Sequence, residues 1–324
     1  MIRKEHCLFA FMSLFTQNAK CISLCPEKME VDMNYEDFCI KVKEAASELF
    51  GESAATEITS VTKNNGLVLK GLTVRHEDSR ISPTIYLENF YEMYESGTPF
   101  GDIMNMLYRY ESKSRRTDIH AEEYTDFESI KDRIIYKIVN FDMNRGLLEH
   151  VPHVEWNDLA IVFCCVLQGG ENGYATVLVR NEHLKMWDID QDELYDLARE
   201  NTPRIMSDEL KTIDEVLPNM FLPEAPDMYI LSNEHRVFGA TCMLYSEHLK
   251  EVADSHLSGI YILPSSIHEV ILMPEECACE EEYMRAMIRE INSTEVDLED
   301  RLSDNLYYYD RDLDCISICS ETGK

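Results

Sequence analysis

Residues 159–167 form an almost unbroken apolar run, LAIVFCCVL, near the middle of the chain. A strand with this composition is buried on both faces, so other elements have to cover its sheet from both sides. Two further apolar runs, Ile260–Leu263 and Val270–Met273, are also predicted to be strands. Because hairpin signals predict antiparallel strands and the segments of helical spacing fall largely in groups of their own, the sequence predicts an α+β fold.

The region from Met33 is predicted to open with a helix and a small antiparallel sheet. Asn34 is placed to cap a helix whose apolar residues share one face, and Gly51 follows its last residue. The predicted strands cover residues 57–63, 67–75 and 83–87, with the hairpin signal Asn65-Gly66 between the first two.

Three more helices are predicted to complete this N-terminal domain. They cover residues 89–96, a segment opened by Thr98-Pro99 that runs to Tyr110, and a segment opened by the capping box at 125–128. The last segment is predicted to be helical because its isoleucines, Ile130, Ile134, Ile135 and Ile138, have helical spacing. We therefore expect an N-terminal α+β domain over residues 33–148.

A second α+β domain is expected over residues 149–312, followed by a polar tail at 313–324. Asp190 is placed to cap a helix over residues 192–200, which Pro203 closes. The other predicted elements are a glycine-rich hairpin loop at 169–173, an exposed connection marked by Pro218, Pro223 and Pro226, a helix at 280–292 and a strand at 306–309.

Two short stretches of this second domain recur at an offset of 65 residues (240 − 175). Ala175-Thr176 matches Ala240-Thr241, and Glu182-His183-Leu184-Lys185 matches Glu247-His248-Leu249-Lys250. An apolar strand precedes each copy. Because two copies are too few for a solenoid, the pattern favours an internal duplication that gives the domain two related halves.

Residues 1–32 are expected to be a disordered extension outside the two domains. The alternative is a signal peptide or anchor, because basic residues at 3–4 precede an apolar stretch at 7–15. No A-x-A-like cleavage site follows that stretch, which favours the extension.

The charge of the chain bears on its partners. It has 61 acidic and 30 basic side chains, a formal net charge of −31. Binding to nucleic acids or anionic membranes needs clustered Lys and Arg, so we expect neither partner. No apolar run reaches the ~18 residues of a membrane span. The odd number of cysteines, 11, lying among apolar neighbours, favours free thiols in the cytoplasm over a disulfide framework.

The segment YILPSSIHEVILMP, residues 261–274, holds the densest group of potentially catalytic residues. A hydrolase would use Ser265 or Ser266 as nucleophile and His268 as base, with Glu269 and a distant group such as His153. However, no glycine flanks the serines as in the strained G-x-S-x-G elbow. Serine hydroxyls and the preceding proline suit a tight turn, so we expect this segment to connect two strands of a hairpin.

Four cysteines toward the C-terminal end supply the only zinc-like pattern: Cys277, Cys279, Cys315 and Cys319. A single residue between the first two strains a tetrahedral site, in which two spacer residues are usual. The second pair lies near the tail. We therefore expect no metal and no cofactor.

Several stretches resemble a family of uncharacterised bacterial proteins, domain of unknown function 5688, over residues 33–312. They are KNNGLVLKGLTVR, SPTIYLENFYEMYESG, DRIIYKIVNFDMNRGLLEHVPHVEWNDLAIVF, HLKMWDID, LARENTPR, YILPSSIHEVILMP and LSDNLYYY. The resemblance implies no activity, substrate or catalytic residue. More distantly, residues 155–310 resemble the YtpQ-like family, also uncharacterised, which implies only an α+β fold for that half.

We therefore expect an acidic cytoplasmic protein that acts as a non-catalytic protein-binding or regulatory module, with a basic partner. One alternative is a hydrolase using Ser265 or Ser266 with His268. A second alternative is a DNA-mimicking inhibitor of a nucleic-acid-binding protein, which would need its acids in a continuous stripe. The oligomeric state stays open.

Overall fold

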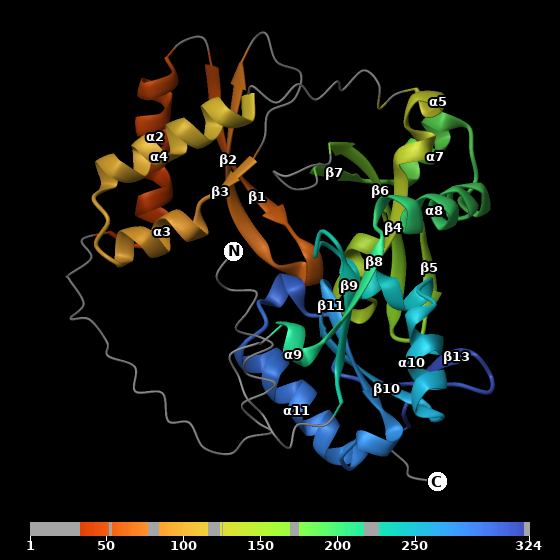
Figure 1. The fold of residues 1–324 in the computed structure, drawn as a ribbon. Helices are drawn as coiled ribbons and strands as arrows, with labels where there is room; N and C mark the ends of the chain where they lie inside the picture. The colour runs from red at the N-terminus through yellow and green to blue at the C-terminus, as the bar shows by residue number, and fades with distance from the viewer. Residues whose placement is uncertain are drawn as a thin grey trace. The chain divides into compact units, whose positions relative to one another are not determined.

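The structure is a computed structural model that describes residues 33–51, 54–76, 84–115, 124, 126–168, 175–216 and 227–320. The expected extension at 1–32, the glycine-rich loop and the three-proline connection lie outside the described residues. The chain divides into two compact units between Thr125 and Asp126 (Figure 1), whereas the sequence predicted a boundary after residue 148. We call them the N-terminal unit and the C-terminal unit.

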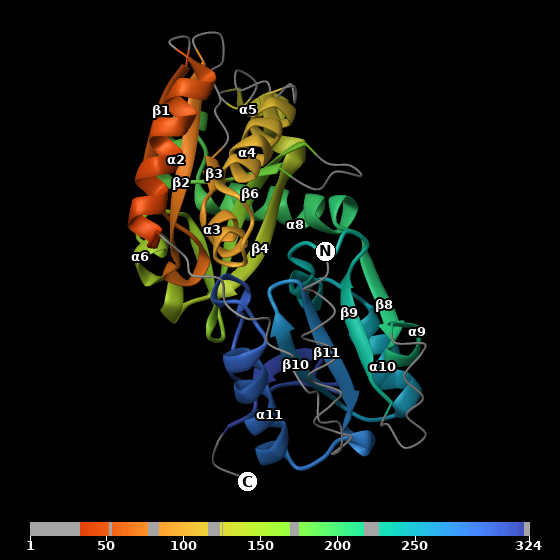
Figure 2. The ribbon, with the colours of Figure 1, turned by 90° about the vertical axis from the view of Figure 1, so that its left-hand side faces the viewer.

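The N-terminal unit is a three-stranded antiparallel sheet, in the order β1-β2-β3, with three helices on one face (Figure 2). Its elements are α2 (Tyr35–Phe50), β1 (Ala54–Thr62), β2 (Val68–His76), β3 (Thr84–Tyr86), α3 (Glu88–Glu95) and α4 (Phe100–Arg115). The helices and the sheet enclose a core in which Phe38, Leu72 and Leu107 are fully buried. All six helices and strands predicted between residues 33 and 110 are present, including the edge strand β3.

Local signals account for the first elements of this unit. The Asn34 side chain accepts a hydrogen bond from the Asp37 N–H at 2.9 Å. At the other end of the helix, the Gly51 N–H donates a hydrogen bond to the Ser47 carbonyl oxygen. At the β1–β2 turn, Asn65 and Gly66 both have positive φ, at 58° and 71°. Asn and Gly tolerate this left-handed region best, which is why the pair marks the hairpin.

The smaller sheet of the C-terminal unit is built around the apolar run from which the fold was predicted. That run is strand β6 (Leu159–Gln168), with β4 (Ile134–Asn140) along one side. Strands β5 (His153–Trp156) and β7 (Ala175–Leu178) pair in succession along the other. Residues 159–166 of β6 are all buried, as expected for a strand covered on both faces.

The helix predicted over residues 125–138 is wrong. Only a single turn of helix, α5 (Phe127–Ile130), and a 3-10 turn, η3 (Lys131–Arg133), precede β4. Strand β4 pairs antiparallel with β6 from Ile134↔Cys165 to Asn140↔Leu159. Its β-branched residues fit a strand whose two faces are buried, and helical spacing of isoleucines does not exclude that arrangement.

The larger sheet of the C-terminal unit has six antiparallel strands in the order β13-β12-β10-β11-β9-β8. They are β8 (Asp208–Thr212), β9 (Tyr229–Asn233), β10 (Ile260–Ser266), β11 (Glu269–Pro274), β12 (Tyr307–Asp310) and β13 (Cys315–Ile318). Strand β13 falls in the segment predicted to be a polar tail. The Asp310 carboxylate accepts the N–H groups of Asp312 and Leu313, and this turn brings β13 back onto β12.

Helices cover both faces of this sheet (Figure 1). On one face α11 (Glu281–Thr294) packs Met284, Ile288 and Ile291 against the sheet. On the other lies α10 (His248–His256). The 3-10 helix η5 (Gly239–Leu244) precedes α10 and contacts β9 and β11. The short elements η6 (Glu275–Cys277) and η7 (Leu298–Asp300) flank α11, and α9 (Ile213–Val216) follows β8.

The remaining helices are η4 (Asp142–Asn144), α6 (Arg145–Leu148), α7 (Asn181–Trp187) and α8 (Gln191–Ile205). Asp190 caps α8 as predicted, accepting the Glu193 N–H at 2.9 Å. The helix continues past Pro203, which the sequence predicted would close it. Because Pro203 lies in the last turn, the helix loses only one backbone hydrogen bond there.

The predicted internal duplication keeps its helices but not the elements before them. Glu182–Lys185 lies in α7, and the matching Glu247–Lys250 supplies the N-cap and the first three residues of α10. In contrast, Ala175-Thr176 belongs to strand β7, whereas Ala240-Thr241 belongs to η5. In the part of the chain that the structure describes, no helix has the length and apolar character to cross a membrane.

Candidate functional site

The segment that raised the hydrolase alternative joins β10 to β11 as a hairpin. Ser265 and Ser266 end β10, Ile267 and His268 form the turn, and Ser266 pairs with Glu269 across it. The two serine residues are 1% and 8% exposed. The predicted hairpin between two strands is therefore confirmed. Its serines, however, lie buried at the end of β10 instead of in the turn.

The His268 ring is engaged away from both serines. Its Nδ1 accepts the Phe238 N–H at 3.3 Å, and its Nε2 lies 3.2 Å from an Asp300 carboxylate oxygen. The ring also stacks on Phe238. The Ser266 hydroxyl accepts the backbone N–H of His268 at 3.0 Å. These contacts fix a turn and provide no serine–imidazole pair, so they give the hydrolase alternative no support.

His153, the distant partner considered for that reaction, lies in β5. Its Nδ1 is 3.1 Å from the Val151 carbonyl oxygen, and its ring packs beside Phe141. Both contacts are local to the β5 edge of the smaller sheet.

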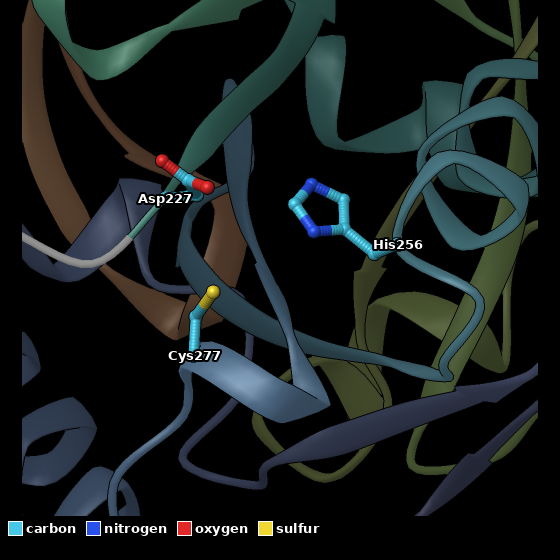
Figure 3. A group of neighbouring side chains, drawn as sticks. All are labelled: Asp227, His256 and Cys277. Atoms are coloured by element: carbon cyan, nitrogen blue, oxygen red, sulfur yellow. The ribbon is translucent and has the colours of Figure 1, made fainter.

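The four cysteines with a zinc-like pattern do not gather in one place. Cys279 and Cys319 pack against the core beneath α11, and Cys315 is exposed on β13. Cys277 instead lies beside Asp227 and His256 (Figure 3). Within the described ranges, those three residues are the one group of at least three His, Cys, Asp or Glu donors that converges closely enough for a metal ion.

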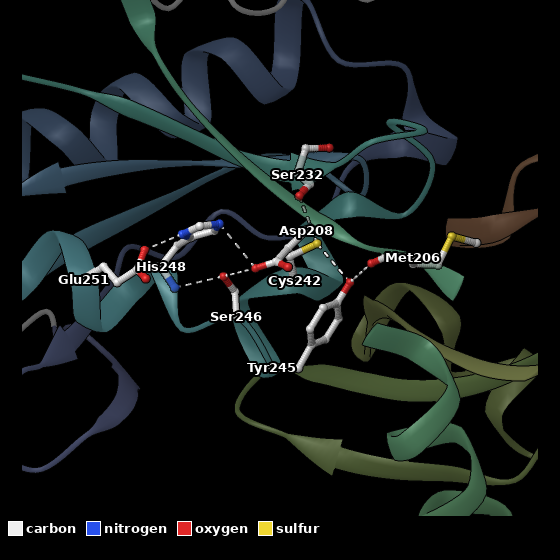
Figure 4. Close-up of polar contacts among 8 residues, drawn as sticks. All are labelled: Met206, Asp208, Ser232, Cys242, Tyr245, Ser246, His248 and Glu251. Carbon is white, nitrogen blue, oxygen red and sulfur yellow. Dashed lines mark hydrogen bonds and ion pairs between the residues drawn. The ribbon is translucent and has the colours of Figure 1, made fainter. Parts of the chain in front are cut away.

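A polar network ties η5 to the segment that connects α8 and β8 (Figure 4). The Tyr245 hydroxyl donates to the Met206 carbonyl at 2.6 Å and lies 3.1 Å from the Cys242 sulfur. Cys242 also donates to the Ser232 carbonyl. Burial raises the pKa of the Cys242 thiol to about 12 and raises the pKa of Tyr245 as well. Both groups therefore stay protonated at neutral pH.

The second half of this network fixes the start of α10. The Ser246 hydroxyl donates to Asp208 at 2.5 Å and accepts the His248 N–H at 3.1 Å. The His248 ring lies between two carboxylates, with Nδ1 2.7 Å from Glu251 and Nε2 3.6 Å from Asp208 (Figure 4). Because the serine hydroxyl faces a carboxylate rather than the imidazole, the group does not have the geometry of a catalytic triad.

Beside this network lies a hollow of about 840 Å³, which we call the α10 hollow. Its lining residues are Trp156, Met243, Leu244, Tyr245, Ser246, Glu247, Leu249, Lys250, Glu251, Asp254, Tyr309, Asp314, Cys315 and Ile316. Four carboxylates and one ammonium group line it, a formal charge of −4 + 1 = −3. Apolar and aromatic side chains form the rest of its surface. A hollow of this size and composition suits a ligand with cationic and apolar parts.

Local contacts hold three of the four carboxylates in place. Glu251 bonds to His248, Asp254 accepts from the Arg311 Nε at 2.7 Å, and Asp314 accepts from the Tyr309 hydroxyl at 2.6 Å. An ionised carboxylate has about four acceptor positions, so each retains capacity for a ligand.

A second hollow, which we call the α7 hollow, lies at the other copy of the repeated tetrapeptide. Its volume is about 610 Å³, and its lining residues are Asn181, Leu184, Lys185, Asp188, Ile189, Asp190 and Glu193. Leu184 and Lys185 correspond to Leu249 and Lys250 of the α10 hollow in the repeat. No aromatic residue is among the lining residues of the α7 hollow.

Sequence analysis missed most of the residues that make these sites; of the three converging donors it named only Cys277, and grouped it with three other cysteines. The α10 hollow draws on five segments between Trp156 and Ile316, and only the Glu-His-Leu-Lys repeat marked one of them. Asp227 and His256 follow no metal-binding spacing with Cys277, so the sequence offered no signal for their convergence.

Comparison with known proteins places the chain in a family. The model of DUF5688, a family of unknown function, matches residues 35–311. No curated protein and no solved structure matches the chain. The comparisons do not show the remote YtpQ-like resemblance. Because the match spans most of the chain and both units, the protein belongs to the family DUF5688.

Proposed function

We propose that the protein is a non-catalytic binding module that takes a basic segment of another protein into the α10 hollow. The observation that carries the proposal is the lining of this hollow: four carboxylates and one lysine around an apolar and aromatic surface. A lysine or arginine side chain matches that lining, because its charged end pairs with carboxylates and its methylene stem covers apolar surface.

Charge over the whole chain supports the same kind of partner. A net charge of −31 attracts basic proteins over distance and accelerates their encounter. The hollow then supplies what bulk charge lacks, namely carboxylates held in fixed positions by His248, Arg311 and Tyr309. Groups that are already ordered lose less entropy when a ligand binds.

Aromatic residues in the lining favour a cationic peptide over a small inorganic cation. Trp156 lines the hollow and stacks on Tyr307, with ring centroids 6.2 Å apart. Tryptophan is the best aromatic partner for a guanidinium or ammonium group.

The cytoplasm is the compartment we propose. All eight cysteines within the described ranges have free thiols, among them the exposed Cys315. Free surface thiols persist in a reducing compartment.

The test is binding of a short fluorescein-labelled peptide rich in lysine, arginine and leucine, followed by fluorescence anisotropy at low and at moderate salt. We expect saturable binding that weakens as salt rises. In the double variant Glu247→Gln/Glu251→Gln, the dissociation constant should rise about tenfold, because two partly exposed charge pairs contribute ~0.7 kcal/mol each. Glutamine at 251 keeps an acceptor for His248.

The matched control is Asp188→Asn/Glu193→Gln, which removes the same charge from the α7 hollow. Its dissociation constant for the peptide should stay within about twofold of that of the unmodified protein. Equal weakening in both double variants would mean that bulk charge alone attracts the peptide, and the α10 hollow would lose its role. Absence of saturable binding at low salt would end the proposal altogether.

A further inference from the structure

Three side chains that are distant in the sequence meet between α10, β9 and β11. Asp227 lies two residues before the start of β9, His256 is the last residue of α10, and Cys277 ends η6 after β11. One ligand atom of each lies within 4.8 Å of the other two. Figure 3 shows the three side chains pointing from separate elements into a common space. We propose that Asp227, His256 and Cys277 form a site for a transition-metal ion of the Zn²⁺ class.

The donor set determines the class of metal. A thiolate, an imidazole and a carboxylate are all ligands that Zn²⁺ accepts, whereas Mg²⁺ and Ca²⁺ prefer oxygen alone. Ligand atoms around a tetrahedral zinc are roughly 3.5 Å apart, given bonds of about 2.0–2.3 Å. The three donors therefore need to approach one another by about 1 Å, which rotation of the exposed Asp227 and the half-buried Cys277 side chains can supply.

The orientation of the His256 ring is already determined. Its Nδ1 lies 2.8 Å from a carboxylate oxygen of Glu276, and its Nε2 lies 2.9 Å from the Tyr229 hydroxyl. A metal-binding histidine commonly has its second nitrogen held by such a partner. The ion takes one nitrogen and displaces the partner there, and the other partner continues to hold the ring.

The surrounding charge also suits a cation. Glu276 adjoins Cys277 in the sequence, and with Asp227 it places two carboxylates around one imidazole and one thiol. Three protein ligands leave a fourth position of a tetrahedral ion for water or for Glu276. Bound there, the ion would join the end of α10 to the start of β9 and the end of β11.

This site is separate from the binding of a basic segment. The α10 hollow uses the first two turns of α10, up to Asp254, and none of its lining residues is a proposed metal ligand. A test of metal binding therefore gives a result that is independent of the test of peptide binding.

The experiment uses the full chain, freed of metal by dialysis against a chelator and titrated with Zn²⁺ by calorimetry and with Co²⁺ by absorption spectroscopy. We expect saturation at one ion per chain and a cobalt spectrum with a thiolate charge-transfer band. Cys277→Ser should abolish that band and weaken Zn²⁺ binding at least ~100-fold, and Glu276→Gln should weaken it ~10–100-fold. Asp227→Asn, at an exposed position, should weaken binding with little effect on folding.

The matched control is Cys279→Ser, because Cys279 is two residues away and lies outside the group. It should leave the stoichiometry, the affinity and the cobalt spectrum unchanged. Circular dichroism of the metal-free variants checks that each is folded. If Zn²⁺ shows no saturable binding, or if the charge-transfer band persists in Cys277→Ser, the assignment of this site is wrong.

Discussion

The same four residues, Glu-His-Leu-Lys, lie at the start of helices α7 and α10, and each helix lines a hollow, yet the two hollows differ in what surrounds them. At α7 the other lining residues come from the same helix, from the segment leading to α8 and from the first turn of α8. At α10, strands β12 and β13 and the β5 residue Trp156 add aromatic and acidic walls. The repeated sequence therefore supplies one wall of each hollow, and the neighbouring elements decide what else lines it.

The two equivalent histidines illustrate the same difference. His183 turns back on its own helix, where its Nδ1 accepts the Arg180 N–H at 3.0 Å and its ring packs beside Trp187. His248 lies between Glu251 and Asp208, a residue of the neighbouring strand β8. The first histidine completes a helix end, whereas the second connects a helix to a sheet.

The largest effect on this difference between the two copies is expected at Gly239, the first residue of η5. In the second copy of the repeat, η5 takes the position that strand β7 has in the first. A Cβ at Gly239 would lie 2.2 Å from the Ser232 hydroxyl and 2.3 Å from the His268 carbonyl oxygen. Because the backbone oxygen cannot move freely, Gly239→Ala should lower the free energy of unfolding by ~2–3 kcal/mol. Urea denaturation measures it. Gly146→Ala, where nothing lies within 4 Å, is the control and should change stability by less than ~1 kcal/mol.

The next effect concerns the hydroxyl that anchors η5 beside the α10 hollow. Tyr245→Phe removes the bonds to the Met206 carbonyl and to Cys242. Leaving those partners unpaired should cost ~1–2 kcal/mol of stability, measured by thermal unfolding. Tyr110→Phe, at a residue that is 58% exposed, should have almost no effect. Equal melting temperatures for the two variants would show that the network does not stabilise this side of the protein.

A smaller effect would sharpen the comparison of the two hollows. Cys315 is exposed and lines the α10 hollow, so a bound basic peptide should slow its alkylation by iodoacetamide a few-fold. Cys277, outside the hollow, should react at the same rate with and without peptide. Mass spectrometry of the digested protein measures both rates. An unchanged Cys315 rate at saturating peptide would place the peptide elsewhere.

The smallest effect is expected at His183. Burial, with a contribution from Arg180, lowers the pKa of His183 below its usual value. The neutral form therefore stabilises the fold fully above the unfolded-state pKa of ~6.5, and this contribution is lost as the pH falls below it. Thermal unfolding at pH 7.5 and 5.5 should show a smaller loss of stability in His183→Gln than in the unmodified protein. An NMR titration midpoint for His183 at or above the usual value would contradict the prediction.

Much of the fold was predictable because its signals are local. The Asn34 cap, the Gly51 helix end and the Asn65-Gly66 turn each depend on residues within a few positions. The apolar run at β6 and the β10–β11 hairpin follow from composition and alternation. The prediction failed at β4, where Ile134, Ile135 and Ile138 fit a helix as well as a buried strand. Pairing with β6 decided between them.

The candidate sites were far less predictable. Ser265, Ser266 and His268 are close in sequence, yet the hairpin directs the His268 ring to Phe238 and Asp300. Adjacency along a strand says little about side-chain contact, because successive side chains point to opposite faces. Conversely, nothing in the sequence connects Asp227, His256 and Cys277, although folding brings them together.

By itself, the sequence determined the α+β class, many of the caps and turns that delimit its elements, and the excess of acidic side chains. Those properties depend on neighbouring residues or on composition, so they need no tertiary contact. Only the tertiary structure decided that residues 134–140 form a strand, that Trp156, α10 and β13 enclose an acidic hollow, and that three distant donors converge. Each of these requires long-range pairing of strands and packing of helices, which short-range patterns do not encode.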